Sequence, residues 1–194
     1  CVKGNVEIIP SDKECIVIES ESDMLRAVET ITIGRRLIIS SHRKFRLPFV
    51  KPLNIKVYVR QLSALEIMSK GNIATAGPLI SPGQFKLKIF SHGSASLDIR
   101  TPMLYGKFAS HGDIRIEGEC WEADIWNASH GSLDLSLLKS ANIALANMGH
   151  GDIELYCEQI LKIRNMGHGN ILYAGTSSVN VILQFGHGKI AHRG

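Results

Sequence analysis

Long hydrophobic runs are missing from this sequence of 194 residues, which nowhere approaches the roughly 20 apolar residues of a membrane-spanning helix. Aromatic residues make up only 6% of the chain, and no phosphate-binding loop of the GxxxxGKT type occurs. Neither sign of charge dominates, since a net charge of +4 is too small to indicate nucleic acid as a partner. What remains, 44% hydrophobic and 21% charged residues, is typical of a globular protein with one domain and a sizeable core.

Cysteine is also scarce, and its four positions (1, 15, 120 and 157) form no CxxC pair and no spacing typical of a metal site. An even count permits disulfides in an oxidising compartment, but the sequence does not assign their pairing. Cys1 is a candidate for the lipidated cysteine of a lipoprotein, since a leader segment could have been removed before it. The strand-like sequence KGNVEI follows at once and leaves no flexible tether, which argues against lipidation.

Six of the eight histidines stand in one repeated motif, a histidine followed by glycine. The motif occurs in FSHGSASL (90–97), ASHGDIRI (109–116), ASHGSLDL (128–135), MGHGDIEL (148–155), MGHGNILY (166–173) and FGHGKIAH (185–192). Its histidines are His92, His111, His130, His150, His168 and His187, and its glycines are Gly93, Gly112, Gly131, Gly151, Gly169 and Gly188. The step from one histidine to the next is nearly constant at about 19 residues, and such a fixed period indicates a solenoid.

Apolar and polar residues alternate on both sides of each motif, as they do along β-strands. We expect each glycine to mark a corner whose backbone conformation other residues resist. Strand, corner and strand make one coil, and successive coils would stack about 4.8 Å apart with parallel strands in register. The sequence therefore predicts an all-β fold, a parallel β-helix or solenoid with about 19 residues per coil. A β-sandwich is less favoured, because it would show turns every ~8–12 residues without such regular recurrence.

An amide column runs through the later repeats, three residues before the histidine. It contains Asn127, Asn147 and Asn165, with Gln184 next. These positions have the inward parity of their apolar neighbours, and stacked amides can hydrogen-bond from coil to coil. A single buried asparagine would cost stability, whereas a ladder satisfies its own donors and acceptors. We therefore predict an internal amide ladder.

The repeat extends upstream of the first histidine. The segment ALEIMSKGNIA (64–74) fits the template with Lys70 in place of histidine. The step from Lys70 to the next motif is longer than the period, so we expect a small insertion at GPLISPGQ (77–84).

The N-terminal part of the chain lacks the regular repeat. We assign residues 53–194 to the solenoid and residues 1–52 to an N-terminal cap, although KGNVEI (3–8) echoes the motif and can join the solenoid. The cap is expected to be rich in β-structure, with one short helix in SDMLRAVE (22–29). Its role would be to close the open end of the solenoid, which is otherwise an adhesive edge.

The phrases SHGDI, GHGDI and GHGNI at this spacing, with GNVEI near the start, resemble the putative auto-transporter adhesin, head GIN domain family (DUF2807). The hallmark of that family is a recurrent Ser-Gly-Ser-Gly-Asp-Ile phrase, and the resemblance covers essentially the whole chain. This chain departs from the family in placing histidine where serine is usual. The resemblance implies a right-handed parallel β-helix, export, and a place at the cell surface, on the outer membrane or in the periplasm of Gram-negative bacteria. It implies no established activity.

In a stack of coils the histidine rings would form a ladder about 24 Å long, with one rung every ~4.8 Å. The simplest interpretation is structural, with flat rings stacked at a corner and nothing bound. The alternative is a metal-binding ladder, since imidazoles at this spacing could share zinc, nickel or copper. Asp113 and Asp152 follow two of the histidines, but serine, asparagine or lysine holds that column elsewhere. This irregularity disfavours a repeated metal site, so we expect no cofactor, with zinc or nickel as the alternative.

Repulsion between charged neighbouring rings should affect how the histidines are protonated. Two positive rings ~5 Å apart repel by roughly several tenths to a few kcal/mol, depending on the local dielectric. We therefore expect the histidines to resist protonation, and acid near about pH 5–6 to loosen the ladder.

An enzymatic function is the less favoured alternative. Some parallel β-helices cleave acidic polysaccharides as lyases or hydrolases, using clustered carboxylates, often with calcium and a basic residue. The candidates here are Asp98, Glu117 and Asp134, a few positions after their histidines. They are scattered singly along a periodic face, which is how a solvated surface looks, and no Ser–His–Asp set can be argued.

Two further features are candidates for binding. The basic stretch GRRLIISSHRKFRLPFVK (34–51) is interpreted as a solvated hairpin of the cap, or alternatively as a contact with lipid headgroups or acidic glycans. Its cations are Arg35, Arg36, Arg43, Lys44, Arg46 and Lys51. Near Trp121, Trp126 has outward parity and could offer a platform for a sugar, although packing over a coil edge is the simpler interpretation.

Together these observations predict a non-enzymatic, exported surface module. Its expected role is that of an adhesin or scaffold that binds a surface glycan or another protein, near a membrane and without nucleic acid as a partner. The repeat explains the fold, whereas the ligand is not specified by any motif.

Overall fold

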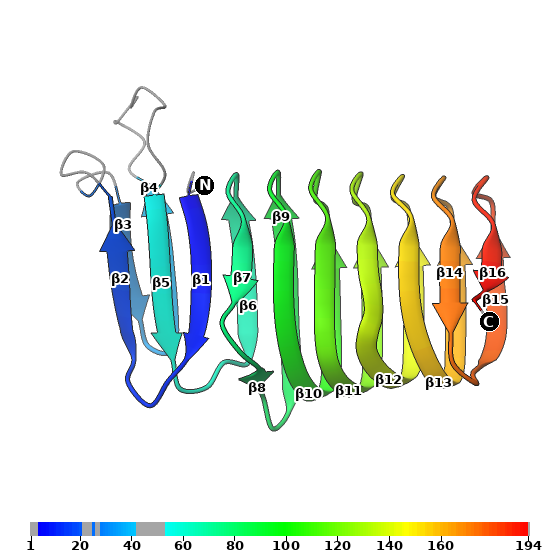
Figure 1. The fold of residues 1–194 in the computed structure, drawn as a ribbon, viewed down its shortest axis with the longest axis horizontal. Coiled ribbons are helices and arrows are strands. Elements are labelled where there is room, and N and C mark those ends of the chain that lie inside the picture. Colours follow the sequence, from blue (N-terminus) through cyan, green and yellow to red (C-terminus); the bar gives the residue numbers. More distant parts are fainter. Residues whose placement is uncertain (1–3, 21–24, 26–27, 42–52, 194) are drawn as a thin grey trace.

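The computed structural model describes residues 4–20, 25, 28–41 and 53–193, and most of them lie in β-strands (Figure 1). Fourteen strands form one large coiling sheet and two form a separate hairpin. The first eight are β1 (Gly4–Pro10), β2 (Cys15–Glu19), β3 (Val28–Ile33), β4 (Arg36–Ser41), β5 (Leu53–Val59), β6 (Ala64–Ser69), β7 (Ile73–Thr75) and β8 (Leu79–Ile80). The others are β9 (Gln84–Ser91), β10 (Ala95–Phe108), β11 (Ile114–Asn127), β12 (Leu133–Asn147), β13 (Ile153–Asn165), β14 (Ile171–Ala174), β15 (Ser178–Gln184) and β16 (Ile190–His192). The predicted parallel β-solenoid, with ~19 residues per coil, is confirmed.

Each complete coil has two arms that run in opposite directions (Figure 1). In β10 the first arm covers residues 95–101, the chain bends, and the second arm covers residues 103–108. The His–Gly corners, which join one coil to the next, lie along the upper edge of Figure 1, and the bends lie along the lower edge. We call the line of corners the crest and the line of bends the bend edge.

Alternate side chains point into the space between the two arms. Ala95, Leu97 and Ile99 in the first arm of β10, and Leu104 and Phe108 in its second arm, are at most 3% exposed. The same inward columns recur in the neighbouring coils because the strands pair in parallel and in register, which joins them into one long core. Burial of one such large side chain contributes about 1.5–3 kcal/mol, so the periodic apolar pattern stabilises every coil in the same way.

Differences in coil length are absorbed near the bend edge. Arg115 of β11 pairs with Asp134, whereas Gly118 pairs with Leu138, so β12 accommodates one extra residue between these two pairs. β13 is in turn shorter than β12 around its bend, and the register of that pairing shifts between Leu135 and Asn142. Leu137, in this adjusted stretch, is 50% exposed. The crest therefore stays in register although the repeats differ in length.

The solenoid begins upstream of the first histidine. β6 leads into a corner with Lys70 at the histidine position, and β7, β8 and β9 form the coil that follows it. The extra residues of this longer step lie between β7 and β9, where the insertion is predicted. β1 pairs in parallel with both β5 and β7, so these first residues lie within the sheet. Gly4 and Gly71 accordingly precede Gly93 in one glycine column.

The remaining N-terminal strands cover the first coil. β2 pairs antiparallel with β5, and β3 pairs antiparallel with β4. Leu53, Ile55 and Val57 of β5 form a small second core, against which Val28 and Ile39 of the hairpin pack. Of the helix predicted at 22–29, Leu25 is helical, the last two residues belong instead to strand β3, and the others lie outside the described residues.

Candidate binding surfaces

The six histidine rings stack along the crest. Their successive ring centroids are 4.7, 5.0, 4.9, 4.9 and 5.3 Å apart, and the planes of neighbouring rings differ by 2° to 13°. All six side chains are exposed. The backbone N–H of each of the first five histidines donates to a carbonyl one coil earlier, over 2.7–3.1 Å, which sets the spacing of their rings. The crest thus presents a regular column of imidazole rings to solvent.

Parallel stacking restricts what the rings can chelate. Equivalent nitrogen atoms on two parallel rings are about as far apart as the ring centroids, at least 4.7 Å. A zinc ion bound to both nitrogens at ~2.1 Å needs them no more than about 4.2 Å apart. Neighbouring rings would have to rotate out of the stack to share an ion. Among the described residues, no group of three or more histidine, cysteine, aspartate or glutamate side chains is placed to hold a metal.

The corner glycines are required for a different reason from the one expected. None of the motif glycines has a positive φ, so the expectation of a special backbone conformation is wrong. A Cβ atom on Gly112, Gly131, Gly151 or Gly169 would overlap the backbone of the glycine one coil earlier. The corner is therefore a close approach of two backbones, which leaves no room for a side chain.

The amide column forms a hydrogen-bonded ladder over three coils. Asn127 Nδ2 donates to Asn147 Oδ1 over 3.0 Å, and Asn147 Nδ2 donates to Asn165 Oδ1 over 2.9 Å, with all three side chains fully buried. Gln184 does not join this ladder. It is exposed, and its amide donates to the carbonyls of Gly186 and Gly188, while Asn165 Nδ2 is left without a partner. The extra methylene of glutamine and the register shift in the β13–β15 pairing account for this difference.

A buried serine column, which sequence reasoning missed, precedes the amide ladder. Ser91 Oγ donates to the carbonyl of Ser69 and accepts the N–H of Gly93, both over 3.1 Å. Ser110 Oγ donates to the carbonyl of Ser91 over 3.2 Å. In the last three repeats glycine replaces this serine, and a Cβ atom on Gly149 or Gly167 would overlap the Nδ2 atom of the ladder asparagine one coil earlier. The change from ASHG to MGHG in the motif was the sequence signal for this exchange.

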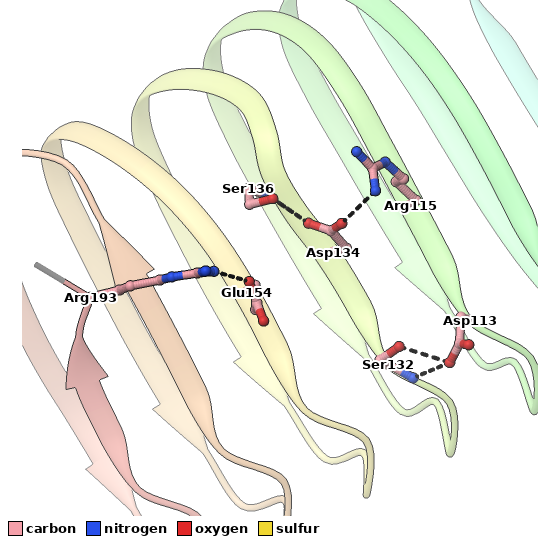
Figure 2. A network of polar contacts seen from close by, with 7 residues as sticks. All are labelled: Asp113, Arg115, Ser132, Asp134, Ser136, Glu154 and Arg193. Carbon is pink, nitrogen blue, oxygen red and sulfur yellow. Dashed lines mark hydrogen bonds and ion pairs between the residues drawn. The ribbon is translucent and has the colours of Figure 1, made fainter.

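A third column lies two residues after each histidine. Asp113 Oδ1 accepts hydrogen bonds from the backbone N–H and the hydroxyl of Ser132, over 2.8 and 2.7 Å (Figure 2). Asp152 Oδ1 accepts the N–H of Asn170 over 2.7 Å. The two hydrogen bonds from Ser132 lower the pKa of Asp113, against a smaller opposing effect of burial. These aspartates therefore bind the next coil.

The carboxylates considered for catalysis are not gathered into one cluster. Asp134 is held by Arg115, with 3.3 Å between Nη1 and Oδ2, and by the hydroxyl of Ser136 (Figure 2). Asp98 and Glu117 are register neighbours on β10 and β11, and both are half-buried. Asp98 Oδ1 is buried without a hydrogen-bond partner. Asp134 is thus occupied in structural contacts, and the face as a whole carries mixed charge.

A shallow cavity of about 520 Å³ lies at the bend edge. Trp121 lines it and is 61% exposed. Four charged residues of successive coils, Arg100, Glu119, Lys139 and Glu158, alternate in sign across it. All four are exposed, and none forms an ion pair with another residue in the described part of the chain. These four charged groups are therefore available to a ligand.

The tryptophan considered as a sugar platform is not the exposed one. Trp126 is half-buried, and Lys107 Nζ lies over its ring, 4.9 Å from the centroid. The alternation of inward and outward residues along the strand predicts that Trp126 points outward. It does not predict that a lysine of the neighbouring coil covers the ring. Trp121 stands where the chain turns between arms, and alternation carries no information there.

The remaining candidates from the sequence are the cysteines and the basic stretch. Cys15, Cys120 and Cys157 are free thiols, and burial raises the pKa of the last two. Arg35 and Arg36 are exposed at the turn of the β3–β4 hairpin. The other cations of the stretch, Arg43, Lys44, Arg46 and Lys51, lie outside the described residues, as does Cys1.

The repeated phrase and the coil that it builds are shared with a known protein family. The model of the family described as "Putative auto-transporter adhesin, head GIN domain" (DUF2807) matches residues 3–177. This chain belongs to that family. No curated protein matches it. Within the described residues, no helix has the length and apolar character needed to cross a membrane.

Several solved structures have a similar fold. A putative adhesin from Bacteroides fragilis NCTC 9343 superposes with a TM-score of 0.93 at 17% identity, covering 99% of this chain and 89% of that one. A putative lipid binding protein from Parabacteroides distasonis ATCC 8503 gives 0.67 at 18% identity, covering 100% and 90%. A putative adhesin from Parabacteroides merdae ATCC 43184 gives 0.62 at 17%, covering 99% and 90%. At these identities the likeness shows the fold of the family.

Proposed function

We propose that this protein is an exported, non-enzymatic adhesion module that binds a glycan in the cavity at the bend edge. The observation that carries the proposal is the exposed Trp121 beside unpaired charged groups of both signs. An aromatic ring offers an apolar face to the C–H groups of a sugar, and nearby charged and hydroxyl groups satisfy the sugar hydroxyls. The family and its structural neighbours, most of them named adhesins, support a surface role.

The chemistry of the cavity supports binding more than catalysis. A glycoside hydrolase needs one carboxylic acid kept protonated by burial and a second carboxylate facing it across the bond. Glu119 and Glu158 are both exposed, and the positive side chain of Lys139 stands on the coil between them. Such carboxylates are suited to accept hydrogen bonds from hydroxyl groups. Export likewise follows from the proposed surface role, and cell fractionation tests it.

The test is a glycan array followed by calorimetric titration of the strongest oligosaccharide. Trp121→Ala should weaken binding by about tenfold or more, equivalent to ~1.4 kcal/mol or more. Trp126→Ala is the matched control, because its ring is half-buried under Lys107 on another face, and it should leave the affinity within about twofold. Equal losses in both variants, or no glycan bound at all, would reject the proposal. Release of new reducing ends from the bound oligosaccharide would show an enzyme instead.

A further inference from the structure

An apolar stripe runs beside the histidines on the same side of the strands. It lies two residues before each crest position and consists of Met68, Phe90, Ala109, Ala128, Met148, Met166 and Phe185. Strand pairing aligns Met68 with Phe90, and backbone hydrogen bonds from coil to coil keep the later members in the same column. Met68, Met148, Met166 and Phe185 are 60%, 47%, 45% and 77% exposed. Large apolar side chains exposed in one line mark an interaction surface.

Basic side chains border the stripe and the histidines. In the columns from four residues before to two residues after the histidine, the cations are Lys70, Lys88, Lys107, Arg164 and Lys189. The acidic groups in the same columns are Glu66, Asp113 and Asp152, which leaves a net charge of +2 from five cations and three anions. Lys88 pairs with Glu66, and the two aspartates accept hydrogen bonds from the next coil. The border is thus cationic before any histidine is protonated.

Acidification adds charge along the same line. Histidine is the side chain that ordinarily gains a proton between about pH 8 and 5. Each protonated ring adds one positive charge to a net charge of +2 in these columns, and repulsion between neighbouring rings makes the gain gradual as the pH falls. The groups that face the rings are Lys70 and Lys189 at the two ends, and Asp113 and Asp152 in between. Attraction for an anionic partner therefore rises as the pH falls.

The shape of the crest narrows the kind of partner. The corners that carry the rings follow a straight edge of the solenoid (Figure 1). The cavity at the bend edge involves none of their residues. A straight, apolar and cationic edge fits a planar partner whose surface is anionic and whose interior is apolar. Methionine and phenylalanine side chains can enter the boundary between headgroups and acyl chains, while lysine, arginine and protonated histidine contact the headgroups.

We propose that the crest binds the surface of an anionic lipid bilayer, and that it binds more tightly in mild acid. This site is separate from the glycan cavity, which lies on the opposite edge of the coils. An anchored crest would leave the bend edge facing away from the lipid.

The experiment is co-sedimentation of the whole chain with vesicles of phosphatidylcholine containing phosphatidylglycerol, at about pH 7.5 and about pH 5.5. The double variant Met148→Glu and Met166→Glu should lose about tenfold or more of its binding at both pH values. Ile80→Glu with Leu137→Glu is the matched control, because these side chains are 61% and 50% exposed away from the crest. It should bind like the parent chain. Circular dichroism of every variant verifies that it is folded.

A second comparison tests the histidines. His111→Ser, His130→Ser and His150→Ser together should leave binding at the higher pH unchanged and remove much of the increase in acid. Equal loss in the methionine and control variants, or equal binding to pure phosphatidylcholine, would overturn the proposal. So would unchanged pH dependence in the triple variant. Binding to soluble heparin that does not need the methionines would identify a soluble polyanion as the partner. Glycan titration of the same variants shows separately whether the bend-edge cavity still functions.

Discussion

At the crest, a hydrogen atom in place of a side chain decides whether two coils can approach. A Cβ atom on Gly131 would overlap the carbonyl of Gly112, whereas one on Gly83 would meet no atom within 4 Å. We expect Gly131→Ala to lower the free energy of unfolding by about 1–3 kcal/mol through overpacking, and Gly83→Ala to have little effect. Urea unfolding of both variants provides the measurement. Identical urea midpoints for the two variants would show that the crest accommodates a methyl group without loss of stability.

The amide ladder makes a prediction that depends on position. Asn147→Leu would leave two buried donors without acceptors, Asn127 Nδ2 and the N–H of Gly149. Asn127→Leu would leave one, the N–H of Ser129. Each orphaned donor costs about 1–3 kcal/mol, so the middle variant should be the less stable by about that amount. Thermal melts of the two leucine variants compare them in the same column, and an equal loss would contradict the ladder.

The carboxylate of Asp113 predicts a dependence on pH. Hydrogen bonds from Ser132 lower its pKa in the folded protein, so its contribution to stability is present above its unfolded pKa and is lost as the pH falls through its folded pKa. Ser132→Ala removes one of the two bonds and should move the pKa of Asp113 back toward its ordinary value. Carbon-13 NMR titration of the carboxyl group measures this. Ser94→Ala is the control, because that hydroxyl forms no hydrogen bond among the described residues, and a similar shift there would refute the assignment.

Individual residues could be placed from the sequence wherever alternation is unbroken. Asn127, Asn147 and Asn165 share the inward parity of their neighbours, and parity holds along the second arms that carry them. Trp121 could not be placed in this way, because it stands at a bend, where two arms with different parity meet. Gln184 was misjudged because its longer side chain reaches backbone carbonyls of its own corner.

At the scale of the strand and the coil, the period was the strongest predictor. It indicated the parallel pairing and the place of the insertion, since a recurring corner can stay aligned only if extra residues loop out elsewhere. The N-terminal strands were harder to place, because the sequence of β1 does not indicate that β5 and β7 are its partners. Pairing over such sequence distances depends on the competition among all available edges.

Coils of equal length should be removable one at a time. Deleting residues 114–132 joins Asp113 directly to Leu133 and preserves every inward column, because these two segments are aligned one coil apart. We expect a folded, shorter and somewhat less stable solenoid, since each coil contacts only its neighbours. Deleting residues 114–131 instead leaves one extra residue after the corner. This shift turns the inward side chains of the next strand outward, so the variant should be clearly less stable. Far-ultraviolet circular dichroism with thermal melting distinguishes the two, and equal melting temperatures would contradict strict register at the crest.

At the scale of the whole molecule, the two long edges are chemically different. The crest carries histidines, an apolar stripe and cations, whereas the bend edge carries an exposed tryptophan among charges of both signs. Coil-length differences are confined to the bend edge, so that edge can change in shape while the crest stays regular. The family relationship predicts the solenoid, whereas this division depends on the side chains that stand in each column of this chain.

The direction of the strand-to-strand hydrogen bonds also determines how the molecule would carry a mechanical load. These bonds run along the long axis of the solenoid, so a pull between its two ends would act on them directly. The bonds between two coils would break before those of the next pair. The coil at an unpaired end would detach first, and each detached coil would release about 65 Å of extended chain, at ~3.4 Å per residue. Under such a load the molecule would lengthen by many small steps, one coil at a time.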